Sequence, residues 1–281
     1  MKLIECPRDA MQGLVQFVPT ETKVAYLQAL LKVGFHTIDF GSFVSPKAIP
    51  QLRDTAQVLA QLDLANSVSK LLAIVANMRG ATEAAAYHEI SYIGFPLSVS
   101  ETFQRRNTNK SIAEAMQEVA RMQELCHQKS KVLVVYLSMG FGNPYNDPWS
   151  AATVRSFVEQ LQQLGVQIVS LSDTIGVADP GVITELFSYL IPAFPDLEFG
   201  AHLHTAPATW QDKVDAAYRA GCQRFDGALR GFGGCPMAKD ELVGNMPTEN
   251  LVAYFENIGL NLGLNKQALE EALARSGTVF L

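Results

Sequence analysis

The stretch "VLVVYLSMGFGNPYNDPWSAATVRSFVEQLQQLGVQIVSLSD", residues 132–173, contains the unit on which the fold depends. Its two ends, 132–138 and 167–173, are rich in aliphatic and β-branched residues, which is typical of buried strands. Between them, residues 150–165 carry apolar side chains at helical spacing. Strands that are apolar throughout are expected in a parallel sheet covered on both faces, so the stretch predicts one right-handed β-α-β unit.

The same alternation recurs along the chain. Segments 20–34 and 111–128 also show helical spacing, and most neighbouring strand candidates are separated by such a segment. Eight β-α units within about 230 residues favour a closed α/β barrel, the (β/α)8 or TIM barrel, because such barrels typically have about 250 residues. The strand candidates are residues 2–6, 37–41, 71–77, 90–95, 132–138, 167–173, 198–204 and 223–229.

The strand-to-helix junctions lack the GxGxxG and GxxxxGK[ST] motifs, which removes support for a dinucleotide-binding or P-loop sheet. The tail after "PTENLVAYFENIG" (247–259) is expected to add two helices and not to form a second domain. We therefore predict a single domain over residues 1–281, a TIM barrel with extra C-terminal helices.

Composition narrows the choice of partners and compartment. The formal net charge is −6, and basic residues do not cluster with aromatic ones, so nucleic acid is not expected as a partner. No run approaches the roughly 18 apolar residues of a membrane span. The four cysteines lack zinc-knuckle spacing and disulfide density, and Met1 stands directly before a strand-like segment without room for a leader. These features predict a cytoplasmic protein.

Polar residues gather where the predicted strands end. In a TIM barrel these carboxyl ends form the mouth that carries the chemistry. His202 and His204 in "GAHLHT" lie two residues apart on one strand, so both should point to the same face and into the mouth. With Asp9 they form a ligand set that suits Mg²⁺ or Mn²⁺ better than a closed zinc site. The alternative is a pair of ordinary interior histidines.

Other residues at the mouth have both a catalytic and a structural interpretation. Arg8 is placed to stabilise an enolate or bind a carboxylate, or else to form an ion pair with Asp9. Cys235 follows the glycines of "GFGG", which would let a loop deliver its thiol, although a lone cysteine is more often a packed residue. The remaining mouth candidates, any one of which could be a cap or turn residue, are Asp39, Asp173 and Asn245.

Six segments, in order, match a known set of motifs, and together they span nearly the whole chain. They resemble 3-hydroxy-3-methylglutaryl-CoA lyases, a family of metal-dependent barrel enzymes whose superfamily includes isopropylmalate and citramalate synthases. The matching segments are "PRDAMQ" (7–12, PRDGLQ in the family), "SFVSPKAIPQ" (42–51, SFVSPK), "SETFQRRNTNKSI" (100–112), "FGNPY" (141–145, FGCPY), "SDTIGVADPG" (172–181, GDTIGVGTPG) and "GFGGCP" (231–236, GLGGCP).

The resemblance implies roles for individual residues. It implies that a divalent cation, Mg²⁺ or Mn²⁺, is held by Asp9, His202, His204 and Asn245. Arg8 would face the thioester carbonyl, and Cys235 would be the loop thiol that helps to protonate the acetyl-CoA carbanion. Asp39 stands where the family has a catalytic glutamate, and Asp173 matches the family's substrate-binding aspartate.

The chain also departs from the family pattern. Where the family reads HxHDTYG, this chain has "HLHTAPA", so Thr205 replaces an acid that could support the metal ligands. Ala10 replaces a glycine, and the segment before Arg8 is one residue shorter. Asp39 is one methylene shorter than glutamate, and the segment after Cys235 is one residue longer. These differences weaken the assignment of Asn245 as a metal ligand, and the choice of substrate, more than they weaken the assignment of the two histidines as metal ligands.

The leading prediction is a retro-Claisen lyase that splits 3-hydroxy-3-methylglutaryl-CoA into acetyl-CoA and acetoacetate, as in leucine degradation and ketone-body formation. The alternative is a related barrel lyase or synthase for another 3-hydroxyacyl-CoA or a 2-oxo acid. A third interpretation is a non-catalytic paralogue that binds an acyl-CoA. Arg105, Arg106 and Lys110 offer charges for the CoA phosphates, or else form a solvated basic turn. A homodimer or higher homo-oligomer is left open.

Overall fold

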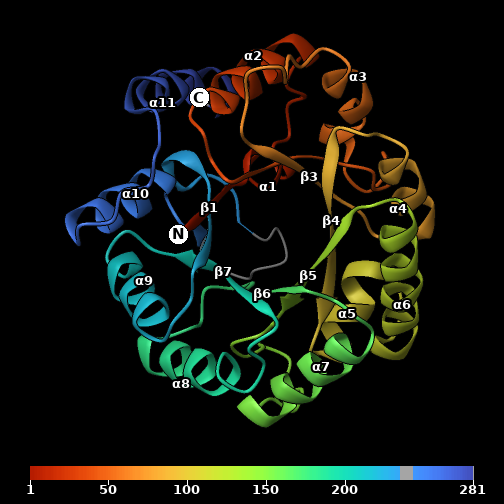
Figure 1. Cartoon of the computed structure of the whole chain (residues 1–281). Helices are drawn as coiled ribbons and strands as arrows, with labels where there is room; N and C mark the ends of the chain where they lie inside the picture. The colour runs from red at the N-terminus through yellow and green to blue at the C-terminus, as the bar shows by residue number, and fades with distance from the viewer. Residues whose placement is uncertain (235–242, 281) are drawn as a thin grey trace.

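The computed structural model describes residues 1–234 and 243–280. Eight parallel strands form a closed sheet, since β6 pairs with β5 on one side and with β7 on the other. Figure 1 shows these strands in the centre with helices around them. The predicted TIM barrel is thus confirmed. The strands are β1 (Lys2–Glu5), β2 (Thr37–Ser42), β3 (Lys70–Ile74), β4 (Ile90–Ser98), β5 (Val132–Ser138), β6 (Ile168–Asp173), β7 (Glu198–Thr205) and β8 (Arg224–Gly227).

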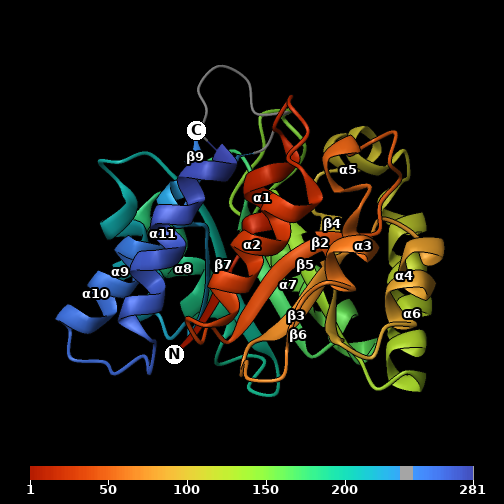
Figure 2. The ribbon, with the colours of Figure 1, turned by 90° about the horizontal axis from the view of Figure 1, so that it is seen from above.

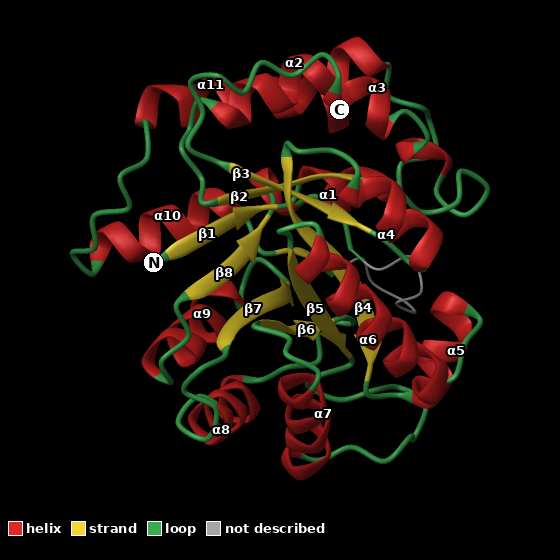
Figure 3. Cartoon of the chain, turned by 45° about the vertical axis from the view of Figure 1, so that its right-hand side comes forward, coloured by secondary structure: helices red, strands yellow, loops and turns green. Residues whose placement is uncertain are grey.

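Every predicted strand is present, with ends shifted by up to three residues. The helices that follow the strands form the outer layer, seen edge-on in Figure 2 and in red in Figure 3. The helices are α1 (Pro7–Gln12), α2 (Thr20–Leu31), α3 (Thr55–Leu59), α4 (Met78–Ala85), α5 (Glu101–Thr108), α6 (Ile112–Gln128), α7 (Ala151–Gln163), α8 (Pro180–Leu190), α9 (Trp210–Arg219), α10 (Thr248–Asn257) and α11 (Lys266–Phe280), with short 3-10 turns η1 (Pro50–Leu52) and η2 (Leu229–Gly231). Within the described residues, no helix is both long and apolar enough to span a membrane.

The C-terminal end of the chain differs from the prediction in one respect. Segment 247–259 itself provides α10, and in the described residues a single helix, α11, follows it instead of two. Gly263 has a positive φ of 67°, which stops a helix from continuing through this connection, and the remaining residues suffice for one helix. α11 lies beside α2 and covers the barrel where the chain begins (Figures 1 and 2).

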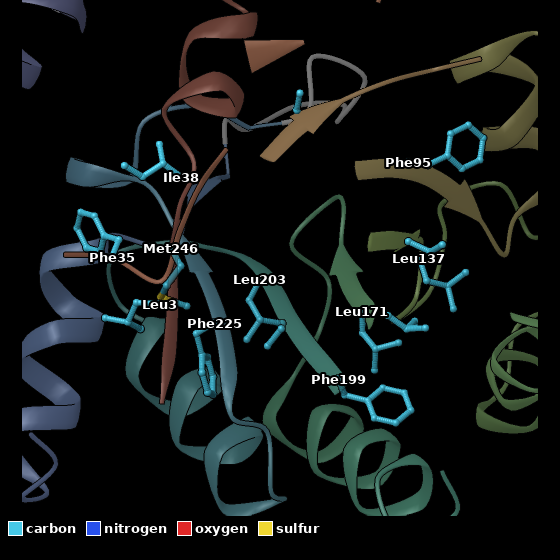
Figure 4. Packing of buried hydrophobic residues seen from close by; sticks show 14 of the residues in the cluster. Leu3, Phe35, Ile38, Phe95, Leu137, Leu171, Phe199, Leu203, Phe225 and Met246 are labelled. Carbon is cyan, nitrogen blue, oxygen red and sulfur yellow. The ribbon is translucent and has the colours of Figure 1, made fainter. Parts of the chain in front are cut away.

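Alternation along each strand separates an outer core from the barrel interior. Leu3, Leu203 and Phe225 belong to the outer core under the helices, and Figure 4 shows them on neighbouring strands. The intervening residues point inward. A smaller apolar cluster fills part of the interior, and its buried members are Leu72, Ile74, Tyr92, Val134, Tyr136 and Ile168.

One short strand was not predicted. β9 (Gly244–Asn245) pairs antiparallel with the end of β7, so that Asn245 lies opposite His204. The segment between β8 and α10 is tied to the barrel by Glu5, a fully buried carboxyl that accepts hydrogen bonds from Leu229 N at 3.0 Å and from the Thr248 hydroxyl. These contacts carry β9 back over the barrel mouth.

Candidate active site

A cavity of about 360 Å³ lies at the carboxyl ends of the barrel strands. One part of its wall carries charged and imidazole groups, and another part is apolar with a few hydroxyl and amide groups. The first set is Arg8, Asp9, Gln12, His202 and His204. The second set is Val44, Ala48, Ile49, Ile74, Val75, Ala76, Pro96, Phe103, Asn107, Thr108, Tyr136, Ser138, Ser172 and Thr174.

Asp9, His202 and His204 form a group that could hold a metal ion. One ligand atom from each residue lies within 4.8 Å of the others, and all three side chains are buried. Both histidines point inward from β7, because Ala201 before them and Leu203 between them take the outward positions in the core. Asp9 comes from α1, directly after β1. The structure therefore brings together the three residues that the sequence had singled out.

Each imidazole is fixed by a hydrogen bond to Nδ1. Asp226 Oδ2 lies 3.1 Å from Nδ1 of His202, and the carbonyl oxygen of Thr174 lies 3.1 Å from Nδ1 of His204. A carbonyl oxygen can only accept, so Nδ1 of His204 carries the hydrogen and Nε2 has a free lone pair. Nε2 of His204 is buried without a hydrogen-bond partner among the described residues. An unpartnered buried nitrogen is costly, so this donor set fits a cation.

Burial and neighbouring charges shift the pKa values of these groups in different directions. Burial by itself raises the pKa of Asp9, but Arg8 and the two histidines outweigh it and lower this pKa to about 2. Burial, reinforced by His202, lowers the pKa of His204 to about 4. For His202, burial lowers the pKa, but Asp226 and Asp9 more than offset it, so the pKa is raised. Asp9 is ionised and His204 neutral near pH 7, which are the forms that bind metals.

Arg8 lies between two carboxylates. Its Nε and Nη2 donate to Asp39 Oδ2 at 2.9 and 2.5 Å, and its Nη1 donates to Asp9 Oδ1 at 3.0 Å. Gln12 also bridges Arg8 and Asp9. Burial raises the pKa of Asp39 to about 6, although Arg8 partly opposes this. Asp9, Asp39 and Asp226 gather around one guanidinium. The raised pKa of His202 shows that Asp226 and Asp9 favour a further positive charge, which a bound divalent cation would supply instead.

Asn245 joins the site through β9. Its Nδ2 donates to Asp9 Oδ2 at 2.8 Å and to the Phe232 carbonyl at 2.9 Å. Gly233 permits this approach: a Cβ there would lie 2.7 Å from both Ala10 Cα and Asn245 Nδ2, and its φ is +91°. Cys235, two residues further on, lies outside the described residues.

Asp173 is positioned behind the cavity wall. As the residue after the inward Ser172 it points outward, where its Oδ2 pairs with Nζ of Lys213 at 2.9 Å and its Oδ1 accepts from Ala178 N at 3.1 Å. Its side chain is fully buried and does not line the cavity. The structure therefore does not place Asp173 beside the metal group.

The three basic residues predicted near the CoA phosphates lie on and just after α5, next to the cavity. Arg105 pairs with Glu101 at 2.8 Å, and Lys110 pairs with Glu118 at 3.3 Å. The Arg106 guanidinium lies 4.8 Å from the centre of the Tyr145 ring. Acids therefore pair with two of these three charges, whereas Arg106 packs against an aromatic ring.

Several functional neighbours were missed by sequence reasoning. Asp226 and Lys213 contact the histidine strand but lie 24 and 9 residues from their partners His202 and His204. Asp226 could have been found, because it follows the outward Phe225 in β8 and therefore takes an inward position. Cys6 also lies close to His202 and Asp226, but burial and four nearby carboxyl groups raise its pKa, so it keeps its proton.

Comparisons with known proteins agree with this geometry. The family model described as HMGL-like matches residues 3–275. The mouse mitochondrial hydroxymethylglutaryl-CoA lyase is 33% identical over 97% of this chain and 83% of its own length. The (R)-citramalyl-CoA lyase of Chloroflexus aurantiacus is 31% identical over 94% of this chain and 85% of its own. A solved HMG-CoA lyase from Acinetobacter baumannii, in complex with coenzyme A and 3-methylmalate, superposes with a TM-score of 0.90 at 30% identity, covering 99% of this chain and 90% of that one.

Proposed function

This chain belongs to the HMGL-like family and is a lyase, and on that basis we propose that it cleaves 3-hydroxy-3-methylglutaryl-CoA to acetyl-CoA and acetoacetate with the help of Mg²⁺ or Mn²⁺. The observation that carries the proposal is the meeting of Asp9, His202 and His204 with Arg8 in one cavity. Asn245, 2.8 Å from Asp9, completes the proposed ligand set.

The charged part of the cavity wall, called the charged wall below, consists of Arg8, Asp9, Gln12, His202 and His204. These residues match the needs of a retro-Claisen cleavage. The reaction requires a tertiary hydroxyl to lose its proton and a thioester enolate to leave. A bound divalent cation lowers the pKa of a coordinated hydroxyl. Asp39 and Asp9 hold the Arg8 guanidinium in place, so it can stabilise negative charge that develops on the thioester oxygen. Asp39, which stands where the family has a catalytic glutamate, is fully buried and does not line the cavity, so we propose that it acts on the reaction by holding Arg8.

The side of the cavity formed by β3, β4 and β5, called the apolar wall below, would hold the acyl group and direct the chain of CoA. Ile74, Pro96 and Tyr136 provide its apolar surface. The hydroxyls of Ser138, Ser172 and Thr174, at or just after the ends of β5 and β6 between this surface and the histidines, can donate to the free carboxylate of the acyl group. Arg106 on α5 is proposed to meet a CoA phosphate. Cys235 is kept as the predicted proton donor to the acetyl-CoA carbanion.

A second candidate substrate is citramalyl-CoA. A citramalyl-CoA lyase is among the similar proteins, and "HLHTAPA" and Asp39 depart from the pattern of the 3-hydroxy-3-methylglutaryl-CoA enzymes. Both substrates are tertiary 3-hydroxyacyl thioesters that release acetyl-CoA, so the charged wall serves either. The apolar wall would decide between them, because a pocket discriminates by the fit of single groups.

Cellular context follows from the choice of substrate. Release of acetoacetate would connect the enzyme to leucine degradation and ketone-body formation. The cytoplasmic location, the single domain over residues 1–281 and a homodimer or higher homo-oligomer stay predictions.

The decisive experiment measures product release from both acyl-CoAs. Purified protein is freed of metal, supplied with Mg²⁺ or Mn²⁺, and assayed for acetyl-CoA and for acetoacetate or pyruvate. We expect metal-dependent acetoacetate release that Arg8→Ala and Cys235→Ser each abolish or strongly reduce. Cys126→Ser is the matched control for the thiol, because Cys126 is a buried residue of α6 that does not line the cavity.

Each result separates the candidates. Pyruvate without acetoacetate would contradict the leading substrate and support citramalyl-CoA. Folded protein that binds neither metal ion and cleaves neither thioester would contradict both, and would support the non-catalytic acyl-CoA-binding paralogue.

A further inference from the structure

Lys213 is a buried cation behind the histidine strand. It lies on α9, is 4% exposed, and its Nζ donates to three acceptors: Asp173 Oδ2 at 2.9 Å, the Gly176 carbonyl at 3.1 Å and the His204 carbonyl at 2.8 Å. A lysine ammonium has three protons to donate, so all of its donors are used. The side chain joins β7, the end of β6 and the loop that follows β6.

The residue after His204 does not support the imidazole. The hydroxyl of Thr205, which stands where an acid is expected, bonds to the Ala206 carbonyl at 3.0 Å and lies 3.2 Å from the Thr209 hydroxyl. Both partners belong to the turn that leads into α9. Thr205 therefore stabilises its own turn, and the support for His204 must come from another element.

That support comes from two other elements, the end of β6 and α9. The ring Nδ1 of His204 lies 3.1 Å from the Thr174 carbonyl, and the main-chain carbonyl of His204 accepts from Lys213. Thr174 directly follows Asp173, and the Thr174 hydroxyl accepts from Met139 N at 2.9 Å. The carbonyl that orients the ring is thus carried by a segment that Lys213 fastens on both sides, at Asp173 and Gly176.

We propose that Lys213 and Asp173 form a positioning pair that fixes the Thr174 carbonyl against His204, so that Nε2 of His204 faces the metal group in the tautomer that can bind an ion. This inference depends on the metal site of the proposed function but not on the identity of the acyl-CoA. Asp173 acts from behind the wall, consistent with its outward direction.

A positioning role makes a specific demand on the pair. Small displacements of a ligand weaken metal binding, and outer contacts to ligands typically change metal affinity by about 10- to 100-fold. A pair that only contributed to folding would change thermal stability and leave metal affinity unaltered. The two roles are therefore separable by measuring both quantities on the same variants.

The chain offers a matched control pair. Lys23 on α2 is 2% exposed, donates to Asp54 Oδ1 at 2.6 Å and also donates to the Gln51 carbonyl. Like Lys213, it is a buried lysine bonded to an aspartate and to a main-chain oxygen. Neither Lys23 nor Asp54 contacts the metal group or lines the cavity.

The test compares Lys213→Met/Asp173→Asn with Lys23→Met/Asp54→Asn. Each double variant removes a buried charge pair without leaving one charge alone. Mn²⁺ binding to metal-free protein, without any acyl-CoA, is followed by the electron paramagnetic resonance signal of free Mn²⁺, and thermal unfolding is recorded in parallel. We expect both variants to lose thermal stability, but only the first to bind Mn²⁺ more weakly, by about 10- to 100-fold.

The inference is overturned if the first variant is folded and binds Mn²⁺ as tightly as the parent, or if both variants weaken binding equally. If the first variant does not fold, the single change Asp173→Asn, which retains an acceptor for Lys213, is compared with Asp54→Asn in the same way, with an expected loss of affinity of about tenfold for Asp173→Asn alone. A parent protein that binds no Mn²⁺ contradicts the proposed function itself, whereas a tightly binding parent with unaffected variants contradicts only the positioning pair.

Discussion

The two walls of the cavity differ in composition although the same barrel provides both. The side formed by β7, β8 and β1 with its following helix carries Asp9, His202, His204 and Asp226. The side formed by β3, β4 and β5 carries Ile74, Pro96 and Tyr136. The strand residues on both sides point inward at alternate positions, and only Asp9 comes from a helix, α1, so the difference arises mainly from the residue types and not from the backbone.

This division separates reaction chemistry from substrate choice. Burial and the charges close by together shift the pKa values of Asp9, Asp39 and His204. Apolar groups act through shape and van der Waals contact, and each contact contributes less interaction energy than a close pair of charges does. Substitutions on the charged wall should therefore alter metal binding and turnover of every substrate, while those on the apolar wall should alter the ratio between substrates.

The largest effect is expected for His204→Ala. Loss of this nitrogen should remove most bound metal and lower the rate about a thousandfold or more, since metal catalysis supplies several kcal/mol of transition-state stabilisation. Metal content by mass spectrometry and turnover of 3-hydroxy-3-methylglutaryl-CoA measure this. Thr205→Ala is the neighbouring control and should keep its metal. Full metal content in folded His204→Ala would show that the charged wall is not the metal site.

Glu5→Gln tests a buried acid that lies outside the cavity, and its effect is on the pH dependence of stability and not on metal binding. Burial raises the pKa of Glu5 from 4.5 to about 8, so the folded protein holds this proton more tightly than the unfolded chain. The unfolding free energy of the parent should therefore fall as pH rises from about 4.5 to about 8, by a few kcal/mol, because one pKa unit corresponds to about 1.4 kcal/mol. Denaturant unfolding at several pH values should show a flatter dependence for Glu5→Gln; identical slopes would contradict the assignment.

Asp226→Asn replaces the carboxyl group beside Nδ1 of His202 with an amide of nearly the same size. We expect Mn²⁺ affinity to fall about tenfold, the lower end of the range for outer contacts to a ligand. Calorimetric titration of metal-free protein checks this, with Asp215→Asn on α9 as control, since Asp215 bonds to Tyr254 and Arg219 outside the barrel. Unchanged Mn²⁺ affinity would show that only the metal ligands themselves, and not Asp226, determine metal binding.

The smallest effect is expected on the apolar wall. Ile74→Val should change the ratio of kcat/KM between 3-hydroxy-3-methylglutaryl-CoA and citramalyl-CoA about two- to tenfold, because one methylene in a pocket contributes about 1 kcal/mol. Mn²⁺ affinity should stay the same. Ile93→Val, which faces the outer core from β4, is the matched control and should leave the ratio unaltered. A change in metal affinity with Ile74→Val would show that the two walls are not independent.

Sequence patterns predicted much of this structure. The strands were found because each is a short run of apolar residues between polar or glycine-rich segments, and the inward direction of His202 and His204 follows from the two-residue period of a strand. The same period places Asp173 outward, next to Ser172, and Asp226 inward. Applying it to those two strands would have moved Asp173 behind the wall and added Asp226 to the site.

Contacts between distant segments could not be read in this way. Nothing in the spacing of Lys213 indicates that it meets Asp173, and the two-residue strand β9 is too short to have a pattern of its own. Such pairs depend on how far neighbouring strands are displaced along one another when the sheet closes, and on the angle at which each helix packs.

By itself the sequence determined the order of strands and helices, the direction of each strand side chain and the presence of an HxH pair at a strand end, because these depend on residues close together in the chain. Only the tertiary structure decided that Asp9 meets His202 and His204, that Arg8 is shared between Asp9 and Asp39, and that Lys213 supports His204 from behind. The physical reason is closure of the barrel. It brings β1 beside β8, and β8 beside β7, and so joins into one site residues from the two ends of the chain.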